Sequence, residues 1–151
     1  MNLQEHILDI LEQNKDNSAQ ERVFNQKEVE TIYIAAYQFY QIGEYTKSCE
    51  LFLQLTKSFP LQSSGWKGLA SAYQMQGLWD PALTAWAFCS LLEAKDPTCH
   101  YHAAECLHAK KEYEEAKKAL AKAKMLSMSE EHTALLQKIN LLEEFCTPIQ
   151  I

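Results

Sequence analysis

The sequence predicts an all-α fold in which helical hairpins repeat along the chain. Glycine and proline are scarce, with four of each among 151 residues, and this scarcity favours helices. Similar residue types also return at a period of about 34 residues, which is typical of stacked helix–turn–helix units. A chain of this length, with 47% hydrophobic residues, suits one domain with its own core.

The repeat is visible in three windows that align without gaps, at residues 29–62, 63–96 and 97–130. Each window has small residues where two antiparallel helices must approach closely and large residues where a helix meets its neighbour. The small residues are Ala36, Ala70 and Ala104 at the eighth position and Ser48, Ala82 and Ala116 at the twentieth; the large ones are Phe39, Tyr73 and Leu107 at the eleventh, Tyr45, Trp79 and Tyr113 at the seventeenth, and Phe52, Trp86 and Leu120 at the twenty-fourth. This pattern predicts three tetratricopeptide-repeat hairpins in a right-handed superhelix.

The turn inside each hairpin is marked in two of the three repeats. Gly43 and Gly77 fall between the two helices of their hairpins, where a residue in the left-handed conformation is wanted. Lys111 stands at the same place in the third repeat. The sequence therefore predicts that the third turn closes in a different way.

Flanking elements are expected to seal the stack, because a terminal hairpin cannot bury both of its faces alone. We divide the chain into an N-terminal amphipathic helix with a linker (1–24), the repeats (25–130), and a C-terminal capping helix with a tail (131–151). Asn25 with Glu28, and Ser127 with Glu130, resemble helix N-caps. The apolar residues at helical spacing are Leu3, Ile7, Ile10 and Leu11 in the first element and Leu135, Leu136, Ile139, Leu142 and Phe145 in the last.

Charge and cysteine content narrow the classes of function. The formal net charge is −6, and an acidic chain repels a phosphate backbone, so nucleic acid is not an expected partner. The five cysteines are odd in number and form no C-x-x-C pair, which indicates free thiols in a reducing compartment. Neither a signal peptide nor a membrane-length apolar stretch is present in the sequence. We expect a cytoplasmic protein.

A binding groove is predicted on the concave face, which the first helix of each hairpin lines. Tyr33, Tyr37 and Tyr40 are spaced at i, i+4 and i+7 on one helix, and tyrosine offers a rigid apolar face with a polar tip that suits peptide binding. The alternative, that these are ordinary core aromatics, is disfavoured because Ile32, Ala36 and Phe39 already make a core-facing stripe. The predicted groove residues are Tyr33, Tyr37, Tyr40, Gln41, Lys67, Ser71, Gln74, Met75, Tyr101, Glu105 and His108.

Other chemistries find no support in the sequence. No nucleophile has an orienting base at a recognisable spacing, so no catalytic residue is predicted. Cys99, His102 and Cys106 are the best candidates for a metal, but no second ligand pair follows them, and neither a metal nor a cofactor is expected. A clamp for the C-terminal carboxylate of a heat-shock protein needs a basic groove, which is missing here.

The run from Tyr101 to Leu107, followed by Lys110 and Glu114-Glu115-Ala116, resembles the third repeat of the class II chaperones of bacterial type III secretion. The resemblance to these LcrH/SycD-like chaperones extends to the order of the elements. It implies a non-enzymatic bacterial protein that holds an extended, Pro- and Leu-containing segment of a hydrophobic translocator in its groove and keeps that client soluble. It also implies dimerisation through Leu3, Ile7, Ile10 and Leu11. The alternative is a repeat scaffold that joins a larger assembly without chaperone activity.

Overall fold

A computed structural model describes residues 24–128 and 130–147, and this part of the chain consists of helices and short connections. The all-α repeat fold predicted from the sequence is confirmed. None of the helices in these ranges is long and apolar enough to cross a bilayer. The elements are α2 (Gln26–Gln41), α3 (Tyr45–Ser58), α4 (Ser63–Met75), α5 (Trp79–Leu92), α6 (Pro97–Ala109), α7 (Tyr113–Leu126), a 3-10 turn η1 (Glu130–His132) and α8 (Thr133–Phe145).

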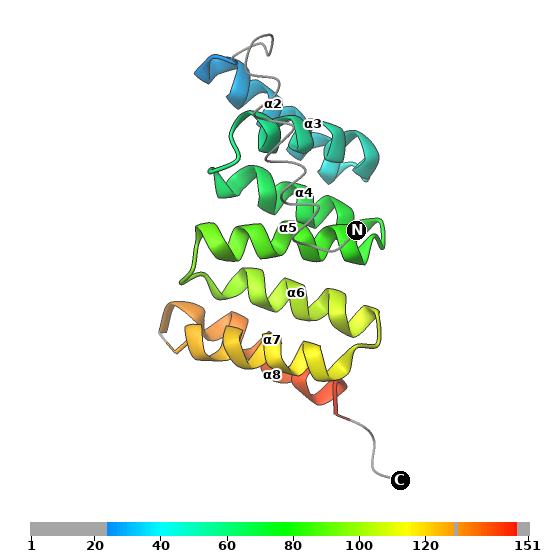
Figure 1. The fold of residues 1–151 in the computed structure, drawn as a ribbon, viewed down its shortest axis with the longest axis vertical. Coiled ribbons are helices and arrows are strands. Elements are labelled where there is room, and N and C mark those ends of the chain that lie inside the picture. Colours follow the sequence, from blue (N-terminus) through cyan, green and yellow to red (C-terminus); the bar gives the residue numbers. More distant parts are fainter. Residues whose placement is uncertain (1–23, 129, 148–151) are drawn as a thin grey trace.

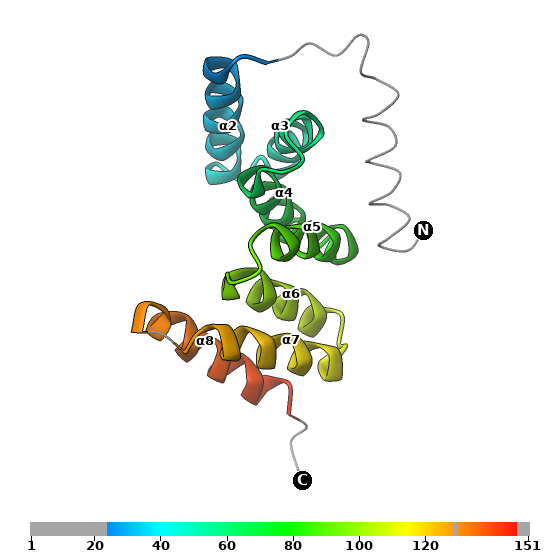
Figure 2. The ribbon, with the colours of Figure 1, turned by 60° about the vertical axis from the view of Figure 1, so that its left-hand side comes forward.

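The helices form three hairpins, α2–α3, α4–α5 and α6–α7, stacked along the long axis of the molecule (Figure 1). Each helix from α2 to α7 packs against the next one in the chain, and α8 closes the far end against α7. The view in Figure 2 shows α2 at the opposite end of the stack. The predicted N-terminal element (1–24) lies almost wholly outside the described residues, and the predicted division of the chain stays a prediction.

The close approach of the two helices in each hairpin depends on the small residues that recur in the sequence. All six, at the eighth and twentieth positions, have no exposed surface. In the first hairpin Ser48 stands where the others have alanine, and its Oγ donates a hydrogen bond of 2.8 Å to the carbonyl of Ala36. The buried hydroxyl is thereby satisfied, so serine is tolerated at a helix crossing.

Large residues at the twenty-fourth position connect one hairpin to the next. Phe52 on α3 is buried against Gly68 on α4, where a Cβ atom would lie 2.2 Å from the phenyl ring. Trp86 on α5 makes the equivalent contact with His102 on α6, whose ring stacks on the indole at 4.6 Å between centroids. A large side chain on the second helix of one repeat therefore requires a small or flat residue on the first helix of the following repeat.

The prediction that the third hairpin turn closes in a different way is wrong. Lys111 adopts a φ of 63°, close to those of Gly43 (82°) and Gly77 (70°). Its amide bonds to the carbonyl of His108, and the amide of Glu112 bonds to that of Leu107. The two glycine turns have the same pair of bonds, so the third turn closes in the same way, with lysine in a left-handed conformation that glycine adopts without strain.

The C-terminal cap also differs from the prediction in detail. Ser127 does not cap α8; it is buried at the end of α7, where its Oγ donates 2.7 Å to the carbonyl of Ala123. The 3-10 turn η1 precedes α8 instead. Ile139 is buried as predicted, but Phe145 is 65% exposed and Cys146 takes the buried place at the end of the helix.

The N-cap predicted for α2 is confirmed, because Asn25 Oδ1 accepts a 2.9 Å bond from the amide of Glu28.

Candidate peptide-binding groove

The tyrosines of α2 lie on a side of the helix that the stack does not close. Ala36 is buried, whereas Tyr33 and Tyr37 are 39% and 51% exposed. The ring of Tyr33 meets Phe52 edge-on at 5.9 Å, and that of Tyr40 meets Tyr45 at 5.4 Å. These contacts hold two of the three rings in place while leaving apolar surface open to solvent.

Between α2 and α4 is a hollow of about 350 Å³, which we call the tyrosine hollow. The tyrosines form one wall, α4 forms the other, and Phe52 of α3 contributes from below. Its lining residues are Tyr33, Tyr37, Tyr40, Phe52, Ser63, Ser64, Lys67, Gly68, Ser71 and Glu93. Five residues predicted for the groove are therefore brought together here: the three tyrosines, Lys67 and Ser71.

A second hollow of about 420 Å³ adjoins the first, because Tyr33 and Ser64 line both. Its lining is mostly apolar, from the N-terminal half of α2 and the end of α3. The lining residues are Val29, Glu30, Tyr33, Ile34, Leu55, Phe59, Gln62, Ser64 and Gly65. Together the two hollows run beside α2, which is a shape suited to an extended segment with apolar side chains.

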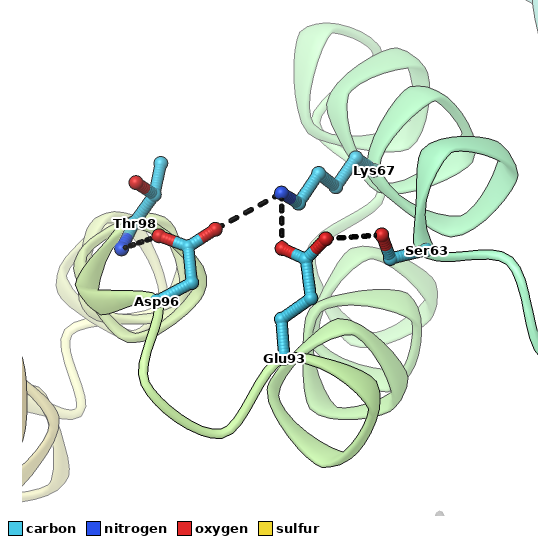
Figure 3. A network of polar contacts seen from close by, with 5 residues as sticks. All are labelled: Ser63, Lys67, Glu93, Asp96 and Thr98. Atoms are coloured by element: carbon cyan, nitrogen blue, oxygen red, sulfur yellow. Dashed lines mark hydrogen bonds and ion pairs between the residues drawn. The ribbon is translucent and has the colours of Figure 1, made fainter.

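A polar network borders the tyrosine hollow and links three helices (Figure 3). Lys67 Nζ pairs with Glu93 and, at 2.9 Å, with Asp96. Glu93 also accepts a bond from Ser63, and Asp96 caps α6 by accepting 2.9 Å from the amide of Thr98. Partial burial raises the pKa of the Asp96 carboxyl, but Lys67 and the bonds from Thr98 outweigh it and hold the pKa at about 2.

The groove continues towards α6 through a second set of polar contacts. Gln74 accepts 3.0 Å from the indole nitrogen of Trp86 and donates 3.2 Å to Glu105. Glu105 in turn pairs with His102. The predicted groove residues Gln74 and Glu105 are therefore neighbours, and their polar atoms already have partners within the chain.

Four predicted groove residues lie away from the hollows. Gln41 and Met75 are exposed at the ends of α2 and α4. Tyr101 packs against the third-repeat core, and burial followed by the charge of Glu105 raises its pKa. His108 lies 5.4 Å from the ring of Tyr113, at the turn of the third hairpin.

Sequence reasoning missed Phe52, Gly68 and Glu93 as lining residues. The sequence did contain a signal for Phe52 and Gly68, because the residue at the twenty-fourth position of one repeat packs against the residue at the sixth position of the next. No sequence signal marked Glu93, which lies in the connection between α5 and α6 and borders the hollow, where Lys67 and Ser63 bond to it.

The residues weighed for a metal are engaged in packing. Cys99 and Cys106 are buried in the core, and His102 is stacked on Trp86 and paired with Glu105. Among the residues that the structure describes, no group of three or more His, Cys, Asp or Glu is placed to hold a metal ion.

Stacked hairpins with an aromatic hollow along one face define a tetratricopeptide-repeat binding module, and comparison with known proteins agrees. The tetratricopeptide-repeat family model matches residues 30–61. The low calcium response locus protein H of Yersinia pestis is 29% identical over 124 residues, which cover 77% of this chain and 74% of that protein.

Among tetratricopeptide-repeat proteins, solved structures of type III secretion chaperones match this fold. The type III secretion chaperone SycD of Yersinia enterocolitica, in complex with a peptide of the translocator YopD, is 28% identical, with a TM-score of 0.77 over 81% of this chain and 94% of that one. PcrH of Pseudomonas aeruginosa shares the fold with a TM-score of 0.79 at 24% identity, over 86% of this chain and 99% of that one. In sequence and fold, the present chain is similar to the class II tetratricopeptide-repeat chaperones of type III secretion.

Proposed function

We propose that this chain is a non-enzymatic chaperone of the bacterial cytoplasm that binds hydrophobic type III secretion translocators. An extended, Pro- and Leu-containing segment of the client lies along the two hollows beside α2, which keeps the client soluble before its export. The observation that carries the proposal is the tyrosine hollow, a space of about 350 Å³ walled by three tyrosines that the side chains of the described residues leave open.

The chemistry of the hollows fits such a client. Tyr33 and Tyr37 offer exposed ring faces, and the adjoining hollow is mainly apolar. Burying one aliphatic side chain there contributes roughly 1.5–3 kcal/mol. Two or three anchors, less the cost of ordering the segment, correspond to affinities on the order of micromolar. A client held this strongly can still be released to the secretion apparatus.

The test is co-expression of the full chain with a type III translocator, followed by measurement of how much translocator is recovered in soluble complex. Tyr33→Ala/Tyr37→Ala removes two exposed rings and is expected to reduce binding about 10- to 100-fold. The fold should survive, because both rings are partly exposed. Tyr113→Ala is the matched control, since Tyr113 is also 39% exposed but lies at the third turn.

A scaffold that joins a larger assembly through its convex face predicts the reverse result. In that case the double tyrosine variant would still capture the translocator, and the groove would be excluded as the binding site. Dimerisation through Leu3, Ile7, Ile10 and Leu11 stays a prediction, because these residues lie outside the described ranges.

A further inference from the structure

A third hollow, of about 380 Å³, lies at the edge of the stack, where the α3–α4 connection meets the end of α5. We call it the edge hollow. It continues the groove, because Ser63, Ser64 and Glu93 line both it and the tyrosine hollow. Gln62 and Ser64 also line the apolar hollow beside α2. The lining residues of the edge hollow are Leu61, Gln62, Ser63, Ser64, Leu92 and Glu93.

The α3–α4 connection is fixed to the core, yet it presents a large apolar side chain to solvent. The indole nitrogen of the buried Trp66 donates a 2.8 Å hydrogen bond to the carbonyl of Pro60. The amide of Gln62 bonds to the carbonyl of Phe59 at 3.1 Å. Leu61 lies between these held residues and is 83% exposed. An apolar side chain on a backbone that is already ordered loses little conformational freedom when a partner covers it, so it suits a binding contact.

The boundary between the edge hollow and the tyrosine hollow carries negative charge. Figure 3 shows the Glu93 carboxylate between Ser63 and Lys67, and it bonds to both. Among the described residues that line the three hollows, Lys67 is the only one with a positive charge, and it is shared between Glu93 and Asp96. Glu93 is also the C-cap of α5, where the carbonyls of the last turn add partial negative charge. A cation of a bound segment is therefore favoured beside Glu93, whose side chain is 38% exposed.

We propose that the edge hollow is a further subsite for the client segment, and that it takes a basic side chain that pairs with Glu93 while an adjoining aliphatic residue packs on Leu61 and Leu92. The occupant is the continuation of the segment in the groove, because the hollows share lining residues. An extended chain advances about 3.5 Å per residue, so neighbouring residues of one segment can fill adjoining hollows. This subsite rests on the proposed function and adds selectivity to it, since a client with an acidic residue at this place is disfavoured.

Fluorescence polarisation with synthetic peptides tests the subsite on the full chain. The peptides share a Leu- and Pro-containing core that ends in leucine, and the residue next to that leucine is Lys, Gln or Glu. A second series carries the variable residue at the other end of the core, because an extended segment can enter from either end. In one series the wild type is expected to bind the Lys peptide about three- to tenfold more tightly than the Glu peptide, with Gln between them. High salt should reduce this difference, since the pair is partly exposed.

Matched variants separate the two contacts of the subsite. Glu93→Gln is expected to abolish the preference for Lys and to leave binding of the Gln peptide nearly unchanged. Glu112→Gln removes the same charge at the third hairpin turn and should keep the preference. Leu61→Ser is expected to weaken every peptide of that series about three- to tenfold, whereas Leu91→Ser should not, because Leu91 is 73% exposed but lines none of the hollows. Circular dichroism checks that the variants keep their helices.

Three results would overturn the subsite and leave the proposed function intact. One is equal affinity of the wild type for the Lys, Gln and Glu peptides in both series. Another is a preference for Lys that survives in Glu93→Gln, and the third is unchanged affinity of every peptide for Leu61→Ser. Failure of all peptides to bind the wild type would instead contradict the proposed function, and the subsite with it.

Discussion

At the scale of single residues, the turn of the third hairpin contains a residue with a strained backbone conformation. Lys111 has a positive φ of 63° in a turn that its two counterparts build from glycine. A left-handed conformation costs a residue with a Cβ atom roughly 1–2 kcal/mol. The third hairpin accepts this cost, and the hydrogen bonds that end α6 form nevertheless.

Replacing Lys111 by glycine is expected to stabilise the protein by about 1 kcal/mol, because the strain is removed and the hydrogen bonds remain. Denaturant unfolding measures the change. Gly43→Ala makes the opposite change in the first turn, where the φ is 82° and nothing lies within 4 Å of the added Cβ. It should lower stability by a similar amount, and a loss of stability in both variants would contradict the account.

Gly68→Ala is expected to destabilise the protein by about 1–3 kcal/mol, since the new methyl group overlaps the buried ring of Phe52 at 2.2 Å. Gly65→Ala in the same helix is the control. The Cβ of an alanine at position 65 would lie 3.4 Å from Leu55. This substitution should therefore raise the helix propensity of α4 with little steric overlap. Equal stability of the two variants in thermal unfolding would show that Phe52 moves aside freely.

At the scale of elements, the polar network holds the starts of α4 and α6 to the end of α5. Lys67 is the shared partner, and its two carboxylates come from the connection between α5 and α6. Burial lowers the pKa of Lys67, but the bonds to Glu93 and Asp96 raise it above its usual value. Lys67 is therefore charged at acidic and neutral pH, and the carboxylates decide how the network responds to acid.

Acid is expected to weaken the protein through Asp96. Its folded-state pKa of about 2 lies below the ordinary value of 3.8, so the stabilisation is present above pH 4 and is lost as the pH falls towards 2. The contribution is roughly 1–2 kcal/mol, reduced by the partial exposure of Lys67.

Asp96→Asn keeps an N-cap on α6 but removes the charge. Its free energy of unfolding should be lower than that of the wild type at pH 6 and should change less between pH 4 and pH 2. Parallel pH profiles for the two proteins, measured by urea unfolding, would exclude Asp96 as the source of the acid sensitivity.

At the scale of the whole molecule, stability is distributed along a stack in which, over the described residues, each hairpin packs mainly on its neighbours. Ends of such a stack open more readily than its centre. The five cysteines report on this gradient, because all are free and buried and they are divided between the two ends of the stack and its middle.

Thiol alkylation followed by mass spectrometry is expected to modify Cys146 and Cys49 before Cys89, Cys99 and Cys106. Cys146 follows the terminal helix and Cys49 is in the first hairpin, whereas the other three lie at the interface of the second and third repeats. Burial also raises the pKa of Cys106 to about 12, which slows its reaction further. Equal rates at all five positions would indicate one global opening instead of fraying from the ends.

The sequence by itself determined the number of hairpins and which side chains are small at the helix crossings. These features follow from local periodicity and residue volume, which a single chain displays directly. It also placed Tyr33, Tyr37 and Tyr40 on one side of α2. Only the tertiary structure decided that Lys67 is paired with two carboxylates, that Phe52 lines the hollow, and that Lys111 adopts the left-handed conformation of the two turn glycines. Those outcomes depend on contacts between residues of different hairpins or on a backbone conformation that neighbouring hydrogen bonds impose, and no spacing within one helix encodes them.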